Sequence, residues 1–315
     1  MTARSEPARG VAIGIDAGGS TTDAVLVAAD GAELARASAG GANLFSVDRQ
    51  DAEANLSSVI SPLLAGHRVR AICIGAAGAG RESDRDELRD VVKWAAPPRM
   101  IVIVTHDGAI ALRAATSKRP AMVVVAGTGS LAYGERADGT SARAGGYGSL
   151  IGDPGSGYAI GLAAIAHAVR GLDGVEPMGP LATEIARELA AMSANDVIES
   201  VARSPHVASE VAALAARVAE ADRAGDAVAR DILAEHERLL GCLAAHVARE
   251  VRNGRTSLAV ALAGGAYDAV PSLAAAVTQA VLATGPCDIE RPMRSAAAGA
   301  AEIALERLRA DGVLG

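Results

Sequence analysis

The stretch IGIDAGGSTT (residues 13–22) joins an apolar strand to a carboxylate and a turn rich in glycine and hydroxyl groups. Asp16 stands where the strand ends, and a second apolar run, AVLVAAD, follows the turn. The same order returns in AMVVVAGTGS (residues 121–130). Each copy continues through an Asp-Gly hairpin signal, at residues 30–31 and 138–139, into a third strand. The sequence therefore predicts an internal duplication of a three-stranded unit.

The rest of the chain alternates strands with helices. Buried strands are predicted at AICIGA, IVIVTHD and SLAVALA, and a helix over residues 47–65 has Ser46 or Asp48 as its N-cap. Residues 155–250 are mostly helical by their 3.6-residue periodicity. The alternation predicts the α/β class, and the hairpins predict mixed sheets. Two copies that face each other would form two domains with a cleft between them.

Composition and charge disfavour several functional classes. The chain has 315 residues, a formal net charge of −7 and few aromatic residues. Such a chain has no general attraction to nucleic acid or anionic lipid, and it has few rings for base stacking. No uncharged stretch reaches membrane-spanning length, and no apolar signal core follows the polar N-terminus. We expect a cytoplasmic protein with no nucleic-acid partner and no membrane partner.

The three cysteines, Cys73, Cys242 and Cys287, lie far apart and form no C-x-x-C motif. This spacing disfavours a disulfide framework, a zinc knuckle and an iron–sulfur site within one chain. Because Cys73 lies in the apolar run AICIGA, we predict that it is a buried core thiol.

The two glycine turns have the composition of anion-binding turns. Glycine lets backbone N–H groups approach an anion, and the hydroxyls add donors. Asp16 would repel phosphate directly, so its position fits a divalent cation between the two. Each turn alone is also compatible with an ordinary hairpin. No G-x-x-x-x-G-K-[ST] motif occurs, and the hairpin unit argues against a dinucleotide fold around residues 75–80.

Five motifs occur in the order found in a known superfamily. DAGGSTT, GAAGAGR, VVVAGTGS, LAGGAYD and SAAAGAA resemble the phosphate, connecting and adenosine motifs of the acetate and sugar kinase/heat-shock/actin ATPases. The segment GGYGSLIGDPGSGYAIG (residues 145–161) is similar to the BadF/BadG/BcrA/BcrD-type family, which includes N-acetylglucosamine kinase. The resemblance covers nearly the whole chain. It implies two RNase H-like domains, residues 1–118 with the C-terminal helix 293–315 and residues 119–292, with ATP in the interdomain cleft.

The resemblance also implies how ATP and Mg²⁺ are held. Asp16 would lie on the magnesium side of the phosphates. The expected ATP-binding residues are Gly18, Gly19, Ser20 and Thr21 in the first phosphate turn, Gly127, Thr128 and Gly129 in the second, and Gly264 and Gly265 beside adenosine.

The implied reaction is phosphorylation of an amino-sugar hydroxyl by ATP, with N-acetylglucosamine 6-phosphate as the expected product. Asp107 ends a buried strand and is implied to be the base, although an aspartate there is also a favoured N-cap. The neighbouring His106 is expected to be structural. Asp153 could accept hydrogen bonds from two sugar hydroxyls, or it could form a plain Asp-Pro turn. The expected sugar-binding residues are Asn43, Gly78, Asp107, Thr128, Gly145, Gly146 and Asp153.

Other functions remain open. Tyr147 stands where the animal kinase has a tryptophan, so glucosamine, a muramic acid derivative or glucose could be the substrate. A second reading is an ATPase that drives electrons into a dehydratase or reductase, but GAAGAGR lacks the cysteine that an intersubunit cluster needs. A chaperone-like or actin-like module and a DNA-binding sugar sensor fit less well, because we find neither a peptide-binding domain nor a DNA-binding headpiece. We expect a homodimer.

Overall fold

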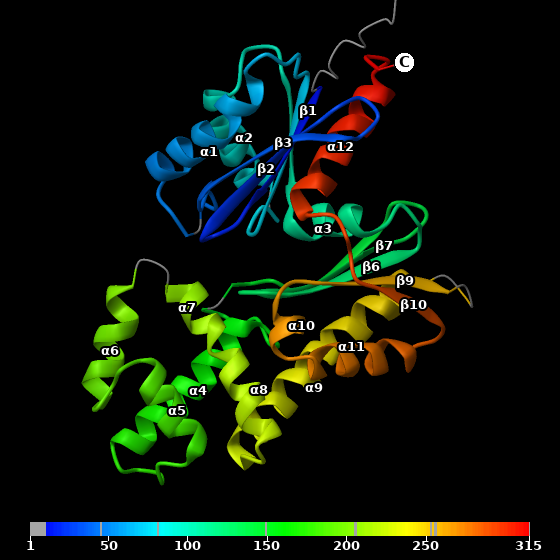
Figure 1. Ribbon diagram of the computed structural model, residues 1–315. Helices are drawn as coiled ribbons and strands as arrows, with labels where there is room; N and C mark the ends of the chain where they lie inside the picture. The colour runs from blue at the N-terminus through cyan, green and yellow to red at the C-terminus, as the bar shows by residue number, and fades with distance from the viewer. Residues whose placement is uncertain are drawn as a thin grey trace, which may run out of the picture. The chain divides into compact units, whose positions relative to one another are not determined.

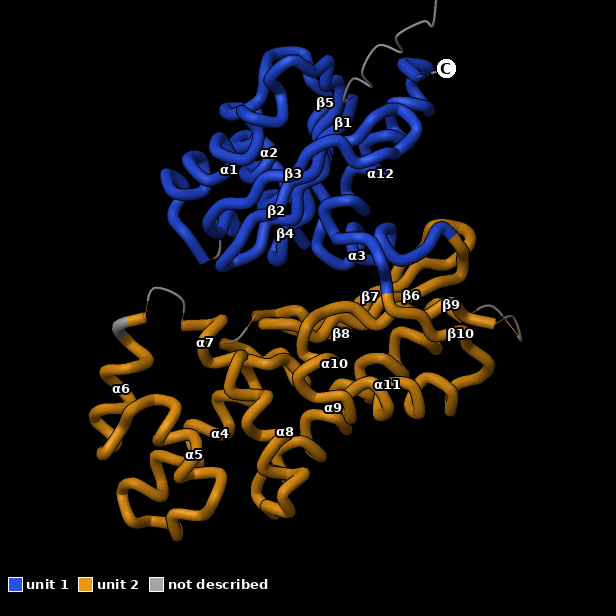
Figure 2. Tube along the Cα trace, viewed as in Figure 1, with its two compact units in different colours: residues 1–117, 292–315 blue, residues 118–291 orange. Residues whose placement is uncertain are grey.

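The computed structural model describes residues 11–44, 46–80, 82–148, 150–204, 207–252, 254 and 257–314. The chain divides into two compact units (Figures 1 and 2). Unit 1 comprises residues 1–117 and 292–315, and unit 2 comprises residues 118–291. We propose these units as the two predicted domains.

Unit 1 is built on a mixed sheet of five strands in the order β3-β2-β1-β4-β5. β1, β2 and β3 are antiparallel neighbours, whereas β4 and β5 run parallel to β1. The predicted strands, including the hairpin unit, are therefore confirmed. The strands are β1 (Ala12–Ala17), β2 (Thr21–Val27), β3 (Glu33–Gly40), β4 (Ala71–Ala76) and β5 (Ile101–His106).

Helices cover both faces of this sheet. Ile13 and Ile15 of β1 point into a core shared with α1 (Arg49–Leu64) and α2 (Glu82–Ala95). Because side chains alternate along a strand, Ala12, Gly14 and Asp16 share the opposite face, which α3 (Asp107–Ala115) and α12 (Ala296–Ala310) cover. α1 begins after Asp48, whose side chain caps it, so Asp48 rather than Ser46 is the N-cap.

Small residues let α12 pack closely on the sheet and on α3. A Cβ atom on Gly14 would lie 2.1 Å from the carbonyl oxygen of Ala297 in α12. A Cβ atom on Gly299 would lie 2.0 Å from the carbonyl oxygen of Ile110 in α3. Both distances are far below a van der Waals contact, so glycine is required at both positions. In Figure 1 the C-terminal helix accordingly lies beside α3 within unit 1. The SAAAGAA motif therefore anchors the helix that begins at Asp107.

Unit 2 repeats the sheet topology of unit 1. Its strands are ordered β10-β9-β6-β7-β8, with β6, β7 and β8 antiparallel and with β9 and β10 parallel to β6. This order matches that of unit 1 strand for strand, so the predicted duplication is confirmed. The short edge strand β10 was not predicted. The strands are β6 (Ala121–Ala126), β7 (Ser130–Glu135), β8 (Ser141–Gly145), β9 (Leu258–Ala263) and β10 (Cys287–Glu290).

The two hairpins also match in detail. Asp30 accepts a hydrogen bond from the backbone of Ala32, and Asp138 accepts one from Thr140, at 3.0 and 2.8 Å. The glycine between them has a positive φ in each case, +87° at Gly31 and +85° at Gly139. In both turns, therefore, the aspartate accepts a backbone hydrogen bond and the glycine adopts the positive φ.

Most of the helices of unit 2 lie between β8 and β9 in sequence, as the periodicity predicted. The 25-residue α9 packs on β6, β7 and β8 and contributes Leu240, Ala244 and Val247 to the core. The helices are α4 (Gly157–Leu172), α5 (Pro180–Glu188), α6 (Ala194–Arg203), α7 (Val207–Ala213), α8 (Ala215–Arg223), α9 (Ala227–Val251), α10 (Ala266–Ala269) and α11 (Ser272–Leu282).

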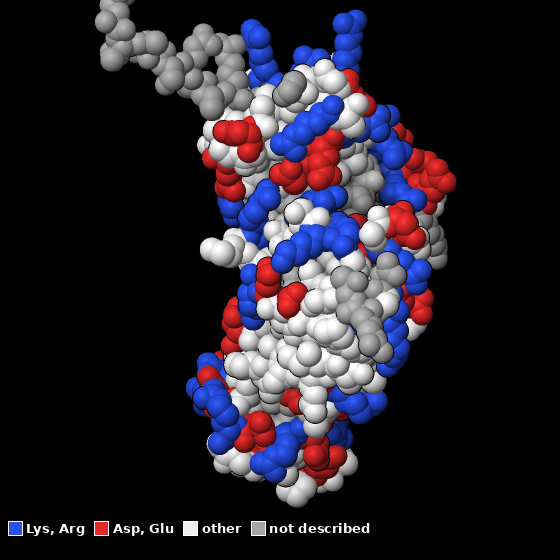
Figure 3. All heavy atoms as spheres, turned by 90° about the vertical axis from the view of Figure 1, so that its right-hand side faces the viewer, with Lys and Arg blue, Asp and Glu red and all other residues white. Residues whose placement is uncertain are grey.

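Within the described part of the chain, no helix combines the length and apolar character needed to cross a membrane. On the face drawn in Figure 3, basic and acidic side chains are interspersed. Cys73 is buried in β4, as predicted, and burial raises the pKa of its thiol to about 12. All three cysteines are free.

Candidate active site

Asp16 lies at the C-terminal end of β1, in the middle of the unit 1 sheet. Its Cα atom pairs with Asp23 of β2 on one side and with Gly75 of β4 on the other. Asp107 begins α3 directly after β5, which is the next strand beyond β4. The sheet therefore brings the predicted metal-side carboxylate and the predicted base to the same edge, because parallel strands end together.

The carboxyl group of Asp16 has a strongly perturbed pKa. Its pKa is raised from 3.8 to about 7, and the largest cause is loss of solvent around the carboxyl group. The negative charges of Asp107 and then Asp23 account for the rest of this rise. A bound cation would stabilise the charged form of a carboxyl group that lies among other carboxylates in this way. Such perturbation is typical of functional sites.

The first glycine turn is closed by a second loop of unit 1. Gly18 donates to the carbonyl of Thr21 at 2.9 Å, and Ala42 and Asn43 donate to the carbonyl of Gly18, both at 3.2 Å. A Cβ atom on Gly41 would lie 2.1 Å from the carbonyl oxygen of Gly19, so only glycine fits there. This packing places the backbone of Asn43 against the predicted phosphate turn.

The three hydroxyls of the first turn differ in accessibility. Thr21 is exposed and Ser20 is partly exposed, so both hydroxyls are available to a ligand. Thr22 is fully buried, and its hydroxyl has no hydrogen-bond partner among the described residues. Thr22 therefore packs as a β-branched core residue, and two of the three hydroxyls remain candidate phosphate donors.

Asp107 is the first residue of α3 and not its N-cap. The cap is His106, whose Nδ1 accepts a hydrogen bond from the backbone of Ala109 at 3.2 Å. Asp107 accepts one from the adjacent Gly108 through Oδ1 at 2.8 Å. The alternative that Asp107 caps this helix is therefore wrong, and the structural role expected for His106 is confirmed. The carboxylate of Asp107 stands in the first turn, where a helix stabilises negative charge.

Asn43 lines a small cavity of unit 1, of about 190 Å³. Gly78 has φ +85° and lies between Ala77 and Ala79, which also line this cavity. Asp84 and Glu87 of α2 bring two carboxylates to the cavity, which the sequence did not predict as site residues. Arg81 of the GAAGAGR motif lies outside the described residues. The cavity lining is Asn43, Leu44, Ala76, Ala77, Ala79, Asp84, Glu87 and Leu88.

The second glycine turn is held by the loop that precedes α4. Gly127 donates to the carbonyl of Gly129 and accepts from the backbone of Gly157, both at 2.8 Å. The hydroxyl of Ser130 donates to the carbonyl of Pro154, also at 2.8 Å. Thr128, between the two glycines, is exposed. The turn and the loop around Pro154 therefore form one connected surface of unit 2.

Asp153 lies against the second turn. It is 6% exposed, and its Oδ1 accepts a hydrogen bond from the backbone of Gly148 at 3.2 Å. A Cβ atom on Gly129 would lie 2.7 Å from Oδ2 of Asp153, so glycine makes room for this carboxylate. The structure thus brings one predicted sugar residue and one predicted ATP residue of unit 2 into contact.

Gly145 and Gly146 both adopt positive φ values, +76° and +73°. Their carbonyl oxygens accept hydrogen bonds from the guanidinium group of Arg143, at 3.2 and 2.7 Å. A sugar would therefore meet carbonyls that already have a charged partner. Sequence reasoning missed Arg143, because the bend at the two glycines is what returns their carbonyls to it.

Gly264 directly follows β9 and packs against the second glycine turn. It has φ +106°, and a Cβ atom on it would lie 2.3 Å from the carbonyl oxygen of Ala126 and 2.9 Å from the nitrogen of Gly127. Gly265 is the N-cap residue of the short helix α10. The predicted adenosine motif and the predicted phosphate turn are therefore in direct contact in unit 2.

The described residues contain no group of three or more His, Cys, Asp or Glu side chains arranged to hold a metal ion. Mg²⁺ in phosphoryl-transfer enzymes is usually held by one or two carboxylates, several waters and the phosphates of the nucleotide. Asp16, with its raised pKa and neighbouring carboxylates, fits that limited role.

A model of the BadF/BadG/BcrA/BcrD ATPase family matches residues 13–304. The chain belongs to this family. Its five-stranded mixed sheets are those of the actin-like ATPase fold, and use of ATP follows from the family.

This chain is similar to two curated relatives and to a solved structure. An N-acetylmuramic acid/N-acetylglucosamine kinase of Clostridium acetobutylicum is 36% identical over 72% of this chain and 76% of that protein. An N-acetyl-D-glucosamine kinase of Dictyostelium discoideum is 31% identical over 59% of this chain and 62% of that protein. The structure of a candidate N-acetylglucosamine kinase from Chromobacterium violaceum has a TM-score of 0.71 and 26% identity, and covers 95% of this chain and 100% of that one.

Proposed function

We propose that this chain transfers the terminal phosphoryl group of ATP to a hydroxyl of an amino sugar, and that N-acetylglucosamine is its substrate. The observation that carries the proposal is the duplicated glycine turn, with Asp16 and Asp107 at one sheet edge of unit 1 and Asp153 beside the turn of unit 2. The relatives named as N-acetylglucosamine kinases support the choice of sugar. We propose the 6-hydroxyl as the acceptor.

ATP is held mainly by backbone groups in this proposal. The N–H groups and free hydroxyls of the two turns donate to phosphate oxygens, and the Gly264–Gly265 loop contacts adenosine. Asp16 holds Mg²⁺ together with the phosphates, and the cation neutralises charge on the transferred group. The phosphate-binding residues are Gly18, Gly19, Ser20, Thr21, Gly127, Thr128 and Gly129.

The sugar is oriented by hydrogen bonds in this proposal, and Asp107 accepts the proton of the attacking hydroxyl. Phosphoryl transfer requires alignment and charge neutralisation more than covalent chemistry, so one positioned carboxylate is enough as the base. Asp153 binds two sugar hydroxyls, because a carboxylate accepts from adjacent donors. The proposed sugar-binding residues are Asn43, Gly78, Asp107, Thr128, Gly145, Gly146 and Asp153.

A second candidate substrate is glucosamine. Tyr147 lies in the family-specific segment and is 66% exposed, so the ring is free to meet a ligand but is not held in a preformed acetamide pocket. N-acetylmuramic acid is a third candidate, since one relative is named for both sugars. We also propose a cytoplasmic homodimer.

A sugar panel tests the proposal directly. ADP release is measured with ATP, Mg²⁺ and each of N-acetylglucosamine, glucosamine, N-acetylmuramic acid and glucose, and 6-deoxy-N-acetylglucosamine tests the acceptor position. We expect the largest kcat/KM with N-acetylglucosamine and no sugar-dependent ADP release with its 6-deoxy analogue. A larger kcat/KM with glucosamine would move the assignment to the second candidate. ADP release that no sugar stimulates would overturn the kinase proposal.

A further inference from the structure

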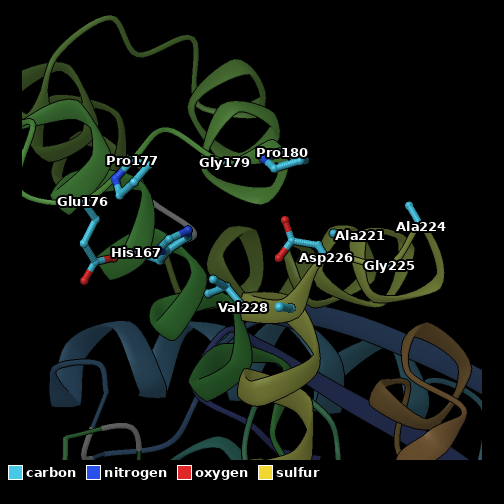
Figure 4. Close-up of a pocket in the computed structure, with 11 residues that line it drawn as sticks. His167, Glu176, Pro177, Gly179, Pro180, Ala221, Ala224, Gly225, Asp226 and Val228 are labelled. Atoms are coloured by element: carbon cyan, nitrogen blue, oxygen red, sulfur yellow. Dashed lines mark hydrogen bonds and ion pairs between the residues drawn. The ribbon is translucent and has the colours of Figure 1, made fainter.

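The helical part of unit 2 contains a cavity of about 560 Å³ that is formed by none of the proposed active-site residues (Figure 4). It lies among α4, the loop before α5, and the junction between α8 and α9. Its volume falls within the range of small-molecule sites. The lining residues that matter for its chemistry are His167, Glu176, Pro180, Ala224, Asp226 and Val228.

His167 brings to this cavity a buried ring with one nitrogen that has no partner among the described residues. The residue is 5% exposed, and its Nδ1 lies 3.0 Å from Oε2 of Glu176. Glu176 also accepts from Arg170 at 2.6 Å, and these hydrogen bonds, that of Arg170 above all, lower its pKa. The carboxylate is therefore an acceptor, so Nδ1 donates to it, and the tautomer that does so in a neutral ring has its lone pair on Nε2. No hydrogen bond from a described residue reaches Nε2.

Asp226 lies across the cavity from the His167–Glu176 pair (Figure 4). Its Oδ1 accepts from the backbone of Ala229 at 3.0 Å and so caps α9. Its Oδ2 accepts from the backbone of Leu181 at 3.1 Å and so holds the start of α5. Each carboxylate oxygen can accept a further hydrogen bond. Hydrogen-bond acceptors therefore lie on both sides of the cavity, and each side has a carboxylate, Glu176 on one and Asp226 on the other.

The remaining lining is largely apolar. Pro177 and Pro180 offer no backbone N–H group, and Ala221, Ala224 and Val228 add aliphatic surface. An anion would meet two carboxylates here, and a very polar ligand would lose hydration against the apolar wall. A ligand with an apolar body and a positively charged hydrogen-bond donor satisfies both parts of the lining.

We propose that this cavity is a binding site for a small organic amine, whose ammonium group donates to Nε2 of His167 and faces the carboxylate of Asp226. The apolar part of the amine lies against the proline and alanine wall. The site does not depend on which sugar the enzyme phosphorylates, because no residue of the proposed active site lines it.

Three probes of one shape separate this chemistry from simple cavity filling: benzylamine, benzoate and toluene. Binding to the full-length protein is measured by calorimetry and by nitrogen shifts of ¹⁵N-labelled histidine. We expect benzylamine to bind with a dissociation constant of about 1 mM or lower and to shift the His167 signal. We expect benzoate and toluene to bind at least about tenfold more weakly, because neither supplies a cationic donor.

Variants locate the binding. Ala224→Phe fills the cavity from an exposed helix C-cap, so the fold should be retained, and it should weaken benzylamine binding at least about tenfold. Ala283→Phe is the matched control, since Ala283 is also an exposed helix C-cap but lies away from the cavity. His167→Phe should weaken binding by a similar factor. No binding of benzylamine at about 10 mM, equal affinity for benzoate or toluene, or unchanged binding in Ala224→Phe would overturn the proposal.

Discussion

The two glycine turns occupy the same place in two sheets of the same topology, yet their surroundings differ. At the end of β1 stands Asp16, and the equivalent position of β6 is Val125. The hydroxyl residues that pair with the last residue of β1 and of β6 also differ. The hydroxyl of Thr22 has no partner among the described residues, whereas that of Ser130 donates to Pro154. The fold therefore supplies the proposed phosphate turn twice, and the proposed metal-side carboxylate only once.

The side chains around the two turns indicate different roles for the two units. In unit 1, carboxylates gather at the sheet edge, and the pKa of Asp16 is raised. In unit 2, the turn is tied into a loop that holds Asp153 against Gly129. In the proposed function, the duplicated fold provides both phosphate turns, and single side chains determine which unit binds the cation and which binds the sugar.

Replacing Asp16 should have the largest effect among the variants that test this difference. Asp16→Asn removes the charge that holds Mg²⁺, so we expect kcat to fall by roughly 10³-fold and the required Mg²⁺ concentration to rise. Steady-state kinetics over a Mg²⁺ series measures both changes. Asp30→Asn is the control, because Asp30 lies in the β2–β3 hairpin at the other end of β2, where asparagine can still accept from Ala32, and it should keep turnover near native. Native turnover of Asp16→Asn at low Mg²⁺ would remove its role.

Replacing Asp153 should affect sugar more than ATP. Asp153→Asn keeps the shape beside Gly129 but loses a charged acceptor, so we expect the KM for the sugar to rise about 10–100-fold. Calorimetry of ATP binding without sugar should change by less than about threefold. Equal losses for ATP and sugar would mean that Asp153 serves to support the phosphate turn.

The raised pKa of Asp16 predicts a pH-dependent stability difference in the absence of Mg²⁺ and nucleotide. The pKa is about 7 in the folded protein and 3.8 for an ordinary aspartate, so the folded state disfavours the charged form. The resulting penalty is absent below pH 3.8 and complete above pH 7. Asp16→Asn should therefore raise Tm at pH 8 and change it little near pH 4. A Tm gain that does not grow with pH would contradict this.

The smallest predicted effects concern the paired hydroxyls. Ser130→Ala leaves the carbonyl of Pro154 without its donor and should lower the free energy of unfolding by about 1 kcal/mol. Thr22→Val replaces an unpartnered buried hydroxyl with a methyl group and should be neutral or stabilising. Denaturant unfolding of both variants checks the difference. A larger loss for Thr22→Val would show that its hydroxyl has a role the structure does not reveal.

Local sequence patterns were enough to predict the strands, the hairpins and the duplication. Apolar runs and Asp-Gly turns depend on neighbours in sequence, so the six hairpin strands could be recognised before any tertiary contact was known. The order of motifs also located the family and most of the proposed site.

The contacts that complete the site depend on tertiary packing and could not be predicted. Arg143 reaches the carbonyls of Gly145 and Gly146 only because the chain bends there. Thr22 is buried because β2 lies inside the sheet, and His106 caps α3 through a ring nitrogen, which is not a usual capping group. The cavity at His167 joins helices that are distant in sequence. In each case a residue's role follows from what the fold places beside it.

The central claim is that the carboxylate edge of unit 1 performs the chemical step, and Asp107→Asn tests it most directly. Because His106 caps α3, this substitution should leave the fold and Tm unchanged. Single-turnover phosphorylation of N-acetylglucosamine, with ATP and sugar saturating, measures the chemical step alone. We expect the rate to fall by about 10²–10⁴-fold while the affinities for ATP and sugar are retained. A rate near that of the native enzyme would contradict the assignment of Asp107 as the base.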